Sequence, residues 1–237
     1  MSTSENRSKK YKVLFFDLDR TLWDYRANSE QTLKDLVTKH TPELVERFDK
    51  FLATFYDVNE SLWLEYRNGR LSKDKLSTQR FIDSFKRLGV DAKPFAEEFS
   101  NDYITESPNK TKLFPKTIET LEYLKNAGYK MFLLTNGFVE VQKVKIRDSN
   151  LEPYFETMIT SEEAGYQKPN EKIFEFALQI VKAEKTDCLM IGDDLESDIE
   201  GAQNFGIDTV FFNPAGLVHE SVPTFEIKQL DELTKLL

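Results

Sequence analysis

Five short, mainly apolar runs are spread along the chain, and none of them alternates strictly with polar residues. The runs are VLFF at 13–16, KMFLL at 130–134, TMIT at 157–160, CLMI at 188–191 and TVFF at 209–212. Apolar runs of this length are typical of β-strands that are covered on both faces. The pattern therefore predicts a buried sheet rather than a sheet with one face in water.

Stretches with helical periodicity separate the later runs. The segment 171–182, EKIFEFALQIVK, repeats apolar residues at intervals of three and four, as one buried face of a helix requires. The segment 117–128, TIETLEYLKNAG, ends at Gly128, a residue type that commonly follows the last turn of a helix. Strands that alternate with helices in this way predict an α/β fold with a parallel sheet.

The stretch between the first two runs has a different composition. Residues 24–108 contain two glycines, Gly69 and Gly89, and many helix-favouring residues, and their aromatic side chains recur at helical intervals. This composition predicts a helical unit inserted after the first strand. We therefore expect a core made of residues 11–23 and 109–237, an inserted helical unit at 24–108, and a flexible N-terminal tail at 1–10.

Composition and charge narrow the classes of function. The 237 residues are 40% hydrophobic, and 32 Lys and Arg against 41 Asp and Glu give a net charge of −9. This balance argues against general binding to nucleic-acid polymers or to an anionic membrane. The sequence has no apolar stretch of bilayer length, no apolar segment typical of a signal peptide, and one cysteine, Cys188, within an apolar run. We expect a cytoplasmic protein with a buried thiol and no internal disulfide.

Two carboxylates follow the first predicted strand directly. Asp17 and Asp19 stand one residue apart in VLFFDLDRTL, so in an extended chain their side chains point to the same side. Residues just beyond the carboxyl ends of parallel strands line the crevice where open α/β sheets bind ligands. Two carboxylates at such close range either share a proton or are held ionised by a cation. Taken alone, the pair is better explained as two solvated loop acids.

Polar residues also follow the second and third predicted strands. KMFLL runs into Thr135, Asn136 and Gly137, which supply a hydroxyl, an amide and a flexible backbone. Lys168 comes after the TMIT run and stands just before Pro169, a residue suited to the first turn of a helix. Each feature alone is weak evidence, because such triplets are often turns and most lysines are solvated.

A second acidic cluster follows the CLMI run. The chain continues there with Gly192, Asp193 and Asp194, and Asp198 comes four residues later. A nucleophile candidate, a hydroxyl, a cation and this cluster thus all come at the ends of predicted strands. The combination indicates one chemical site at the carboxyl edge of the sheet.

The elements DLDRT, TNG, the lysine followed by proline, and GDDLESD, in that order, resemble the four motifs of the haloacid dehalogenase-like hydrolases. Most members of that superfamily are magnesium-dependent phosphatases. The motifs and the strands between them cover nearly the whole chain. The resemblance implies a Rossmann-like parallel sheet core with a helical cap inserted directly after the first motif, which agrees with the composition of residues 24–108.

The resemblance also implies a mechanism. Asp17 would be the nucleophile that attacks phosphorus and forms an aspartyl-phosphate, and Asp19 the general acid and base that protonates the leaving oxygen and then activates water. Dehalogenases of this superfamily lack an acid at the position of Asp19, because cleavage of a carbon–halogen bond needs no proton on the leaving group. The sequence therefore favours a phosphatase.

The phosphate and metal contacts follow from the same resemblance. Thr135, Asn136, Gly137 and Lys168 would hold the transferring phosphoryl group, since such transfer depends mainly on positioning and charge stabilisation. Arg20 is either a charge at the rim of the site or a substrate contact, and the sequence leaves both open.

The implied cofactor is Mg²⁺. By the resemblance it would be bound by the side chain of Asp17, the backbone carbonyl of Asp19 and the side chain of Asp193, with water completing an octahedron. GDDLESD does not settle whether Asp194 or Asp198 is the further acid near the metal. We favour Asp198, because a GD-xxxx-D pattern is common in the family.

At a finer level the sequence is similar to the bacterial pyrimidine 5′-nucleotidase branch. The similar stretches are DLDRTLWDYRANS, NESLWLEYRNGRLSKDKL and TNGFVEVQKVKIRDSNLEPYF. A nucleobase is recognised by an aromatic face and by amide or guanidinium donors. The candidates for this role are Trp23, Asn28, Trp63, Tyr66 and Arg67. Trp63 and Tyr66, three residues apart on a predicted helix, have packing inside the cap as their alternative role.

Other reactions remain open at the level of sequence. The substrate is either a nucleoside 5′-monophosphate, with a pyrimidine preferred, or a sugar phosphate or other small metabolite. A phosphomutase similar to β-phosphoglucomutase would return the phosphoryl group to a sugar. A non-enzymatic phospho-receiver also assembles Asp, Thr, Lys and Mg²⁺, but receivers lack a cap. The expected partner is a small phosphorylated metabolite, and the oligomeric state is unknown.

Overall fold

The computed structural model of the chain describes residues 10–237 and separates them into two compact units. One unit contains residues 10–24, 113–140 and 149–237, and we call it the core. The other contains residues 25–112 and 141–148, and we call it the helical unit. Of the predicted N-terminal tail, residues 1–9 lie outside the described residues.

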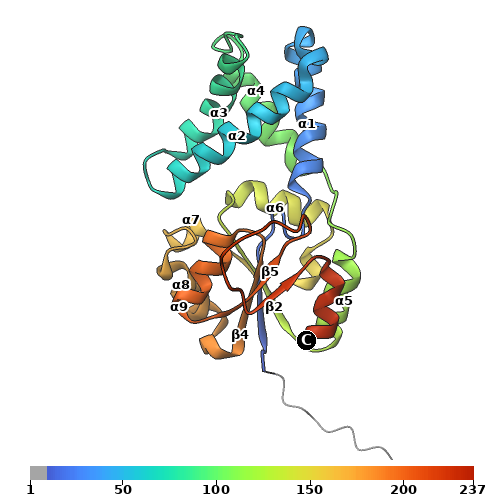
Figure 1. Ribbon diagram of the computed structural model, residues 1–237, viewed down its shortest axis with the longest axis vertical. Helices are drawn as coiled ribbons and strands as arrows, with labels where there is room; N and C mark the ends of the chain where they lie inside the picture. Colours follow the sequence, from blue (N-terminus) through green and yellow to red (C-terminus); the bar gives the residue numbers. More distant parts are fainter. Residues whose placement is uncertain (1–9) are drawn as a thin grey trace, which may run out of the picture. The chain divides into compact units, whose positions relative to one another are not determined.

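The core is built on a sheet of six parallel strands in the order β3-β2-β1-β4-β5-β6. Figure 1 labels β2, β4 and β5. The strands are β1 (Val13–Phe16), β2 (Lys130–Thr135), β3 (Thr157–Thr160), β4 (Cys188–Gly192), β5 (Asp208–Phe212) and β6 (Phe225–Ile227). All four residues of β1 and all five of β4 are buried. The predicted parallel α/β fold is confirmed, and β1 lies between β2 and β4 near the middle of the sheet.

The five predicted strands occur within one residue of their expected bounds, and β6 is an additional strand. The segment 213–224 that precedes its three residues exposes several apolar side chains. Apolar residues in this region therefore do not mark a buried strand. Within the described part of the chain, the short edge strand pairs with β5 alone. Edge strands of this length carry little sequence signal.

Helices cover both faces of the core sheet. Figure 1 shows α8 and α9 on one side and α5 and α10 on the other. The helices assigned wholly to the core are α5 (Thr117–Asn126), α7 (Ser161–Ala164), α8 (Glu171–Val181), α9 (Gly201–Phe205) and α10 (Leu233–Leu236). A π-helical turn at Leu195–Glu200 runs directly into α9. Since both faces are covered, the strands read as apolar runs without alternation.

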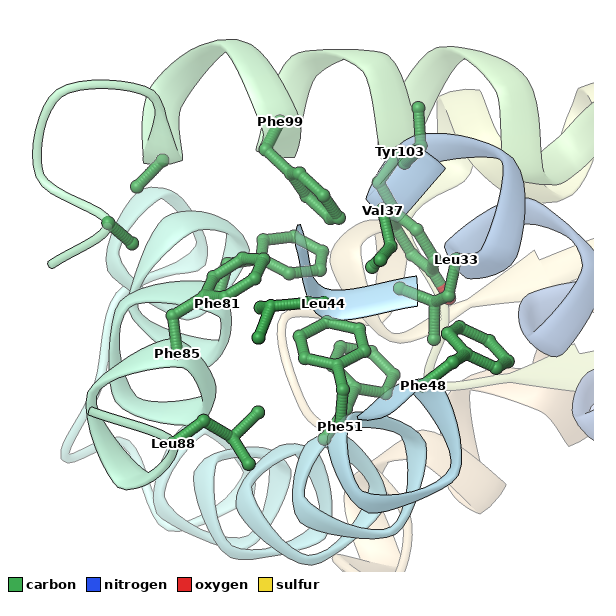
Figure 2. Packing of buried hydrophobic residues seen from close by; sticks show 14 residues of the cluster. Leu33, Val37, Leu44, Phe48, Phe51, Phe81, Phe85, Leu88, Phe99 and Tyr103 are labelled. Carbon is green, nitrogen blue, oxygen red and sulfur yellow. The ribbon is translucent and has the colours of Figure 1, made fainter. Parts of the chain in front are cut away.

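The helical unit is packed around aromatic rings. Its helices are α1 (Tyr25–His40), α2 (Phe48–Arg67), α3 (Lys73–Arg87) and α4 (Ala96–Glu106), and most of α6 (Val139–Asp148) groups with it. The buried cluster contains Phe51, Phe55, Phe81, Phe85 and Phe99, each with none of its surface exposed. Figure 2 shows Phe51, Phe81, Phe85 and Phe99 packed together. Aromatic residues at helical spacing therefore form the interior of this unit.

The observed unit boundaries fall at 24/25 and 112/113, whereas the sequence placed them at 23/24 and 108/109. Residues 141–148 group with the helical unit, although their position between two strands placed them in the predicted core. In residues 10–237, no helix is both long and apolar enough to span a membrane. Cys188 is a free, fully buried cysteine.

Candidate active site

Three strand ends meet at the carboxyl edge of the core sheet. Asp17 follows β1, Thr135 is the last residue of β2, and Asp193 follows β4. The amide N–H of Asp17 donates to the carbonyl of Ile191 at 2.9 Å, which extends the pairing of β1 with β4. Adjacent parallel strands bring these residues together, as the positions of the polar residues in the sequence predict.

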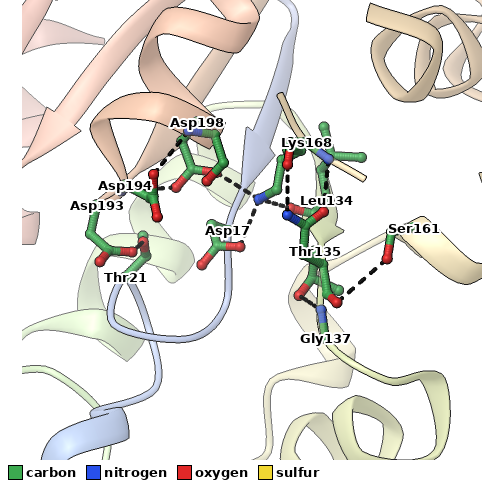
Figure 3. Close-up of polar contacts among 12 residues, drawn as sticks. Asp17, Thr21, Leu134, Thr135, Gly137, Ser161, Lys168, Asp193, Asp194 and Asp198 are labelled. Atoms are coloured by element: carbon green, nitrogen blue, oxygen red, sulfur yellow. Dashed lines mark hydrogen bonds and ion pairs between the residues drawn. The ribbon is translucent and has the colours of Figure 1, made fainter. Parts of the chain in front are cut away.

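Lys168 is buried among these strand ends. Its ammonium donates to Asp17 Oδ1 at 2.8 Å, to Asp198 Oδ1 at 2.7 Å and to the carbonyl of Leu134 at 2.6 Å (Figure 3). An ammonium has three N–H donors, and each of them has an acceptor here. With 1% of its surface exposed, Lys168 is fixed in position and orients the Asp17 carboxylate.

Three carboxylates gather around this lysine. Asp17, Asp193 and Asp198 each offer an oxygen, and these atoms lie within 4.8 Å of one another. Asp17 and Asp198 are buried, while Asp193 is half-buried. Three acids against one contacting lysine leave negative charge in excess, and hard divalent cations prefer oxygen ligands of this kind. The donor set therefore fits Mg²⁺.

The pKa values of the clustered groups reflect the same excess of negative charge. Burial raises the pKa of Asp17 to about 7, and the attraction of Lys168 offsets part of that effect. Burial, together with Asp17 and Asp198, raises the pKa of Asp193 well above its ordinary value. Burial alone would lower the pKa of Lys168, but the two carboxylates that it contacts raise it instead. Lys168 therefore stays protonated, and the acids require a further cation to be fully ionised.

Asp198 depends on a glycine for its position. A Cβ atom on Gly192 would lie 2.2 Å from Asp198 Oδ2, so only glycine leaves room for this carboxylate beside the end of β4. Asp198 Oδ2 also accepts the amide N–H of Asp194 at 3.2 Å, while Oδ1 accepts from Lys168. Both oxygens of Asp198 thus already have a donor.

Asp194 has a different task. Its Oδ1 accepts the amide N–H groups of Glu196 and Ser197 at 3.1 and 2.9 Å, which caps the π-helical turn that follows. Of the two acids that the sequence left open, the structure places Asp198 in the carboxylate cluster and Asp194 at the start of a helix. The role of Asp198 near a metal stays a prediction.

Two further neighbours of the site are Thr21, which sequence reasoning did not single out, and Arg20, for which it left open a rim charge or a substrate contact. Thr21 is fully buried, and its hydroxyl donates to Asp193 Oδ1 at 3.2 Å. Arg20 is partly exposed, has a backbone φ of 68°, and its charge lowers the pKa of Asp193 in part. The sequence feature that could have identified Thr21 is its position four residues after Asp17. The chain forms a tight turn there, in which the Leu22 N–H donates to the Leu18 carbonyl.

Asn136 holds the backbone of Lys168 by both groups of its amide. Its Nδ2 donates to the carbonyl of Lys168 at 2.9 Å, and its Oδ1 accepts the amide N–H of Lys168 at 2.8 Å. The sequence predicted this amide as a phosphate contact. In the structure both of its groups are used by the lysine, so a direct contact with phosphate stays a prediction.

Thr135 and Gly137 lie beside this clamp. The Thr135 hydroxyl accepts the amide N–H of Gly137 at 3.0 Å, which fixes the turn after β2. Ser161 donates to the carbonyl of Asn136 at 3.4 Å. These bonds hold the turn in one conformation at the same edge as Asp17 (Figure 3).

Asp19 is not one of the three clustered carboxylates. It is partly exposed, and its backbone forms a parallel bridge with Trp23. Its charge still raises the pKa of Asp17. A more exposed carboxyl group near a buried nucleophile candidate is available for proton exchange.

Two of the predicted specificity residues, Trp23 and Asn28, make structural contacts within the unit to which each belongs. Trp23 is fully buried in the core, where its backbone also forms an antiparallel bridge with Leu113. Asn28 is 1% exposed, donates to the carbonyl of Lys112 at 2.8 Å and accepts the Lys112 amide N–H at 3.0 Å. Through these contacts both residues stabilise the fold. Their contacts with a substrate stay predictions.

The other three specificity candidates lie on α2 of the helical unit. Trp63, Tyr66 and Arg67 are partly exposed. Trp63 and Tyr66 contact each other edge to face, with ring centres 5.6 Å apart. Neither belongs to the buried cluster of that unit, so the alternative that they form its interior is not supported.

Comparison with known proteins places these observations in a family. The family model of the haloacid dehalogenase-like hydrolases matches residues 11–206. The pyrimidine 5′-nucleotidase YjjG of Escherichia coli is 33% identical over 240 residues, covering 96% of this chain and 98% of the relative. The pyrimidine 5′-nucleotidase PynA of Streptococcus pneumoniae is 30% identical, covering 94% and 93%.

A solved structure agrees with the fold over nearly the whole chain. The HAD-hydrolase YfnB from Bacillus subtilis matches with a TM-score of 0.87 and 28% identity, covering 96% of this chain and 99% of that chain. Its crystal structure was determined with magnesium bound and reveals interdomain movement. A magnesium-bound relative is consistent with the carboxylate cluster around Lys168.

Proposed function

The chain belongs to the haloacid dehalogenase-like hydrolases, and from this premise we propose that it is a magnesium-dependent phosphomonoesterase that hydrolyses nucleoside 5′-monophosphates, with pyrimidine bases preferred. The observation that carries the proposal is the Asp17 carboxylate, fixed by Lys168 at 2.8 Å beside Asp193 and Asp198. A nucleophile must be held in one orientation to attack in line, and this contact supplies that orientation.

The reaction proceeds in two steps on the residues of the core. In the first step, an oxygen of Asp17 bonds to phosphorus while the bond to the leaving oxygen breaks, and Asp19 gives its proton to that oxygen. In the second step, Asp19 takes a proton from water, the water oxygen bonds to phosphorus, and the bond from phosphorus to Asp17 breaks. Phosphate leaves, and both carboxyl groups regain their starting protonation.

Magnesium would be held by Asp17 and Asp193, with the Asp19 carbonyl as the further predicted ligand. Both oxygens of Asp198 already have donors, which leaves this acid to orient Lys168. When bound, the ion supplies positive charge that offsets the repulsion between an ionised nucleophile and a phosphate dianion. Thr21 keeps Asp193 in place through its hydrogen bond of 3.2 Å.

The phosphoryl group would be received at the turn after β2. The Thr135 hydroxyl and the backbone at Gly137 stand next to Lys168, whose charge favours anionic oxygens. Asn136 keeps the lysine at this position through its two bonds to the Lys168 backbone. Phosphoryl transfer depends mainly on such positioning and on charge stabilisation.

The nucleotide preference rests on two lines of support. Two relatives with about 30% identity over nearly the whole chain are pyrimidine 5′-nucleotidases. Within the chain, Trp63 and Tyr66 form a partly exposed aromatic pair on α2, with Arg67 beside them in sequence. Aromatic faces and guanidinium groups are suited to a planar base that carries carbonyl groups.

A substrate panel tests the proposal. Phosphate release with Mg²⁺ would be measured on UMP, dUMP, dTMP, purine monophosphates, hexose phosphates and a generic aryl phosphate, with the Asp17→Asn protein as blank. We expect turnover of the pyrimidine monophosphates to exceed that of the other substrates. Preference for a sugar phosphate would retain the chemistry and reject the nucleotidase. Full turnover in chelator would reject the metal assignment, as would a loss of turnover that added Mg²⁺ does not restore.

A further inference from the structure

The helical unit contains a buried cation without an acidic partner. Arg80 lies on α3 with 6% of its surface exposed. Its Nε donates to the carbonyl of Ser77 at 3.2 Å, and its Nη1 donates to Asn59 Oδ1 at 3.4 Å. Among residues 10–237, no carboxylate lies within ion-pair distance of this guanidinium. Both hydrogen-bond acceptors are neutral, so its charge is not balanced.

Two aromatic rings complete the surroundings of this guanidinium. Its central carbon lies 5.0 Å from the ring centre of Phe81 and 4.8 Å from that of Tyr103. Ring faces attract a cation, but they do not replace strong hydrogen-bond acceptors. A guanidinium has more N–H donors than the two bonds to Ser77 and Asn59 use. Burying such a group without a counter-charge is costly, and proteins that need only packing use an apolar side chain there.

The residues around Arg80 are linked through α2 to the partly exposed pair Trp63 and Tyr66. Asn59 is 2% exposed and lies one helical turn before Trp63 and two turns before Tyr66, so the three share one face of the helix. Asn59 also donates to the Tyr25 hydroxyl at 3.3 Å. Along this face the interior changes from phenylalanine to a polar pair, Asn59 with Arg80, and then to partly exposed rings.

We propose that Arg80 is the specificity-determining residue that binds a planar, carbonyl-bearing ring, as a pyrimidine base is, through N–H groups in the plane of its guanidinium. Asn59 holds the guanidinium in that plane, and the Trp63–Tyr66 pair offers the ring an aromatic surface. This inference rests on the proposed nucleotidase function and names the residue that selects the base. A carbonyl acceptor would satisfy the donors that the protein leaves unused.

A purely structural Arg80 makes the opposite prediction about stability. If its bonds to Ser77 and Asn59 served only to join α3 to α2, removing them would lower the melting temperature and affect all substrates alike. If the residue serves recognition, replacing a buried unbalanced charge by an apolar side chain leaves the melting temperature unchanged or raises it. The loss then falls on substrates that carry a base.

The variant Arg80→Met tests the proposed role of Arg80. Its control is Arg87→Met, a change about two turns further along α3. Arg87 is exposed and pairs with Asp57. The kcat/KM of each protein would be measured on UMP and on a generic aryl phosphate, together with its thermal melt. For Arg80→Met we expect kcat/KM on UMP to fall about 10- to 100-fold. We expect the aryl phosphate value to stay within about twofold, and the melt not to fall. Arg87→Met should resemble the wild type in all three measurements.

Equal losses on both substrates, a lower melting temperature, or an unchanged UMP value in Arg80→Met would each overturn the inference. A binding experiment tests the role of Arg80 separately from the proposed reaction. The affinity of UMP for the wild type and for Arg80→Met would be measured by calorimetry with the nucleophile replaced, as Asp17→Asn, in both proteins. If the wild type hydrolyses no phosphate ester at all, the proposed function fails. The binding experiment then still decides the inference, because weaker UMP binding supports it and equal binding rejects it.

Discussion

Two asparagines make the same contact in the two units of the molecule. Asn136 in the core holds the backbone N–H and carbonyl of Lys168 with its side-chain amide, and Asn28 in the helical unit holds those of Lys112. All four hydrogen bonds lie between 2.8 and 3.0 Å. In the core the residue that is held has a buried ammonium in contact with two carboxylates. In the helical unit the clamp joins the first helix of the insertion to its last residue.

The difference between the surroundings of Lys168 and Lys112 shows that the asparagine contact does not by itself make a catalytic site. Its effect depends on what surrounds the residue that it holds. Around Lys168 lie buried carboxylates whose pKa values are raised by burial, whereas the helical unit is filled mainly by phenylalanine rings. Perturbations of the core should therefore change catalysis first, and perturbations of the helical unit should change stability or substrate choice.

The largest effect is expected from Asp17→Asn. The change removes the proposed nucleophile but keeps the shape of the side chain and a hydrogen-bond acceptor for Lys168. We expect turnover of an aryl phosphate to fall by about 10⁴-fold or more, as for other covalent nucleophiles. The melting temperature should be nearly unchanged, because one acid is removed from a cluster with too many.

The matched control is Asp187→Asn, which removes a partly exposed acid that pairs with Lys12 at the other edge of the sheet. This control should keep wild-type turnover. Near-wild-type activity in Asp17→Asn would refute the nucleophile assignment.

Gly192→Ala should have the next largest effect. Its Cβ would lie 2.2 Å from Asp198 Oδ2, so the carboxylate must move, and Lys168 loses one of its acceptors. We expect kcat/KM to fall by about 100-fold, as for other displacements of catalytic groups. Overpacking should also reduce the free energy of unfolding by about 1–3 kcal/mol.

Gly89→Ala in the helical unit is the comparison for this change. Gly89 has a φ of 79°, and a Cβ there would meet nothing within 4 Å. The strained backbone should lower stability by about 1 kcal/mol and leave aryl phosphate turnover unchanged. If the two alanine variants lose activity equally, the close approach of Gly192 to Asp198 has no catalytic importance.

The two clamps can be tested directly against each other. In Asn136→Ala, Lys168 loses both backbone bonds, and we expect kcat/KM on an aryl phosphate to fall about 10- to 100-fold, as for residues that orient functional groups. In Asn28→Ala, we expect a loss of about 1–2 kcal/mol in unfolding free energy, with aryl phosphate turnover within about twofold of wild type.

Steady-state kinetics and thermal melts of both proteins check this pair. Equal kinetic effects would show that the clamp near Lys168 is not special. A loss on UMP alone in Asn28→Ala would support the predicted contact of Asn28 with the base.

The sequence predicted the core well because motif residues and strand ends coincide there. Asp17, Thr135, Lys168 and Asp193 each follow an apolar run or precede a helix, and parallel pairing brings such positions together whatever the side chains do. The clamp by Asn136 was not predictable, because an amide at a strand end suits phosphate and backbone equally well. Which of them it binds depends on the path of a segment more than thirty residues away.

The helical unit was predictable only as a class of structure. Aromatic residues at helical spacing predicted its buried cluster, but the same spacing did not distinguish the interior Phe55 from the partly exposed Trp63. Arg80 gave no signal, since an arginine on an amphipathic helix is usually solvated. Its burial follows from the packing of α2, α3 and α4, which involves contacts between distant parts of the sequence. The missed β6 has the same cause, since among residues 10–237 it pairs with β5 alone.

The last contrast between the units concerns pH. Without a metal, burial raises the pKa of Asp17 to about 7, whereas an aspartate in an unfolded chain has a pKa of about 3.9. A raised pKa means that the folded state binds the proton more tightly. This group therefore contributes stability below about pH 4 and loses that contribution as the pH rises to about 7. The pKa values of Asp193 and Asp198 are raised as well, with the same sign.

Magnesium requires the ionised carboxylates, so its stabilising effect must increase over the same pH range. We expect saturating Mg²⁺ to raise the melting temperature of the core by a few degrees at about pH 8 and by less than half as much at about pH 5.5. Trp23 lies in the core and Trp63 in the helical unit, so fluorescence melts of a Trp63→Phe protein follow the core alone. Asp193→Asn should abolish the magnesium effect at both pH values. An effect that is equal at the two pH values, or larger at the lower one, would show that protons and magnesium do not compete for these carboxylates.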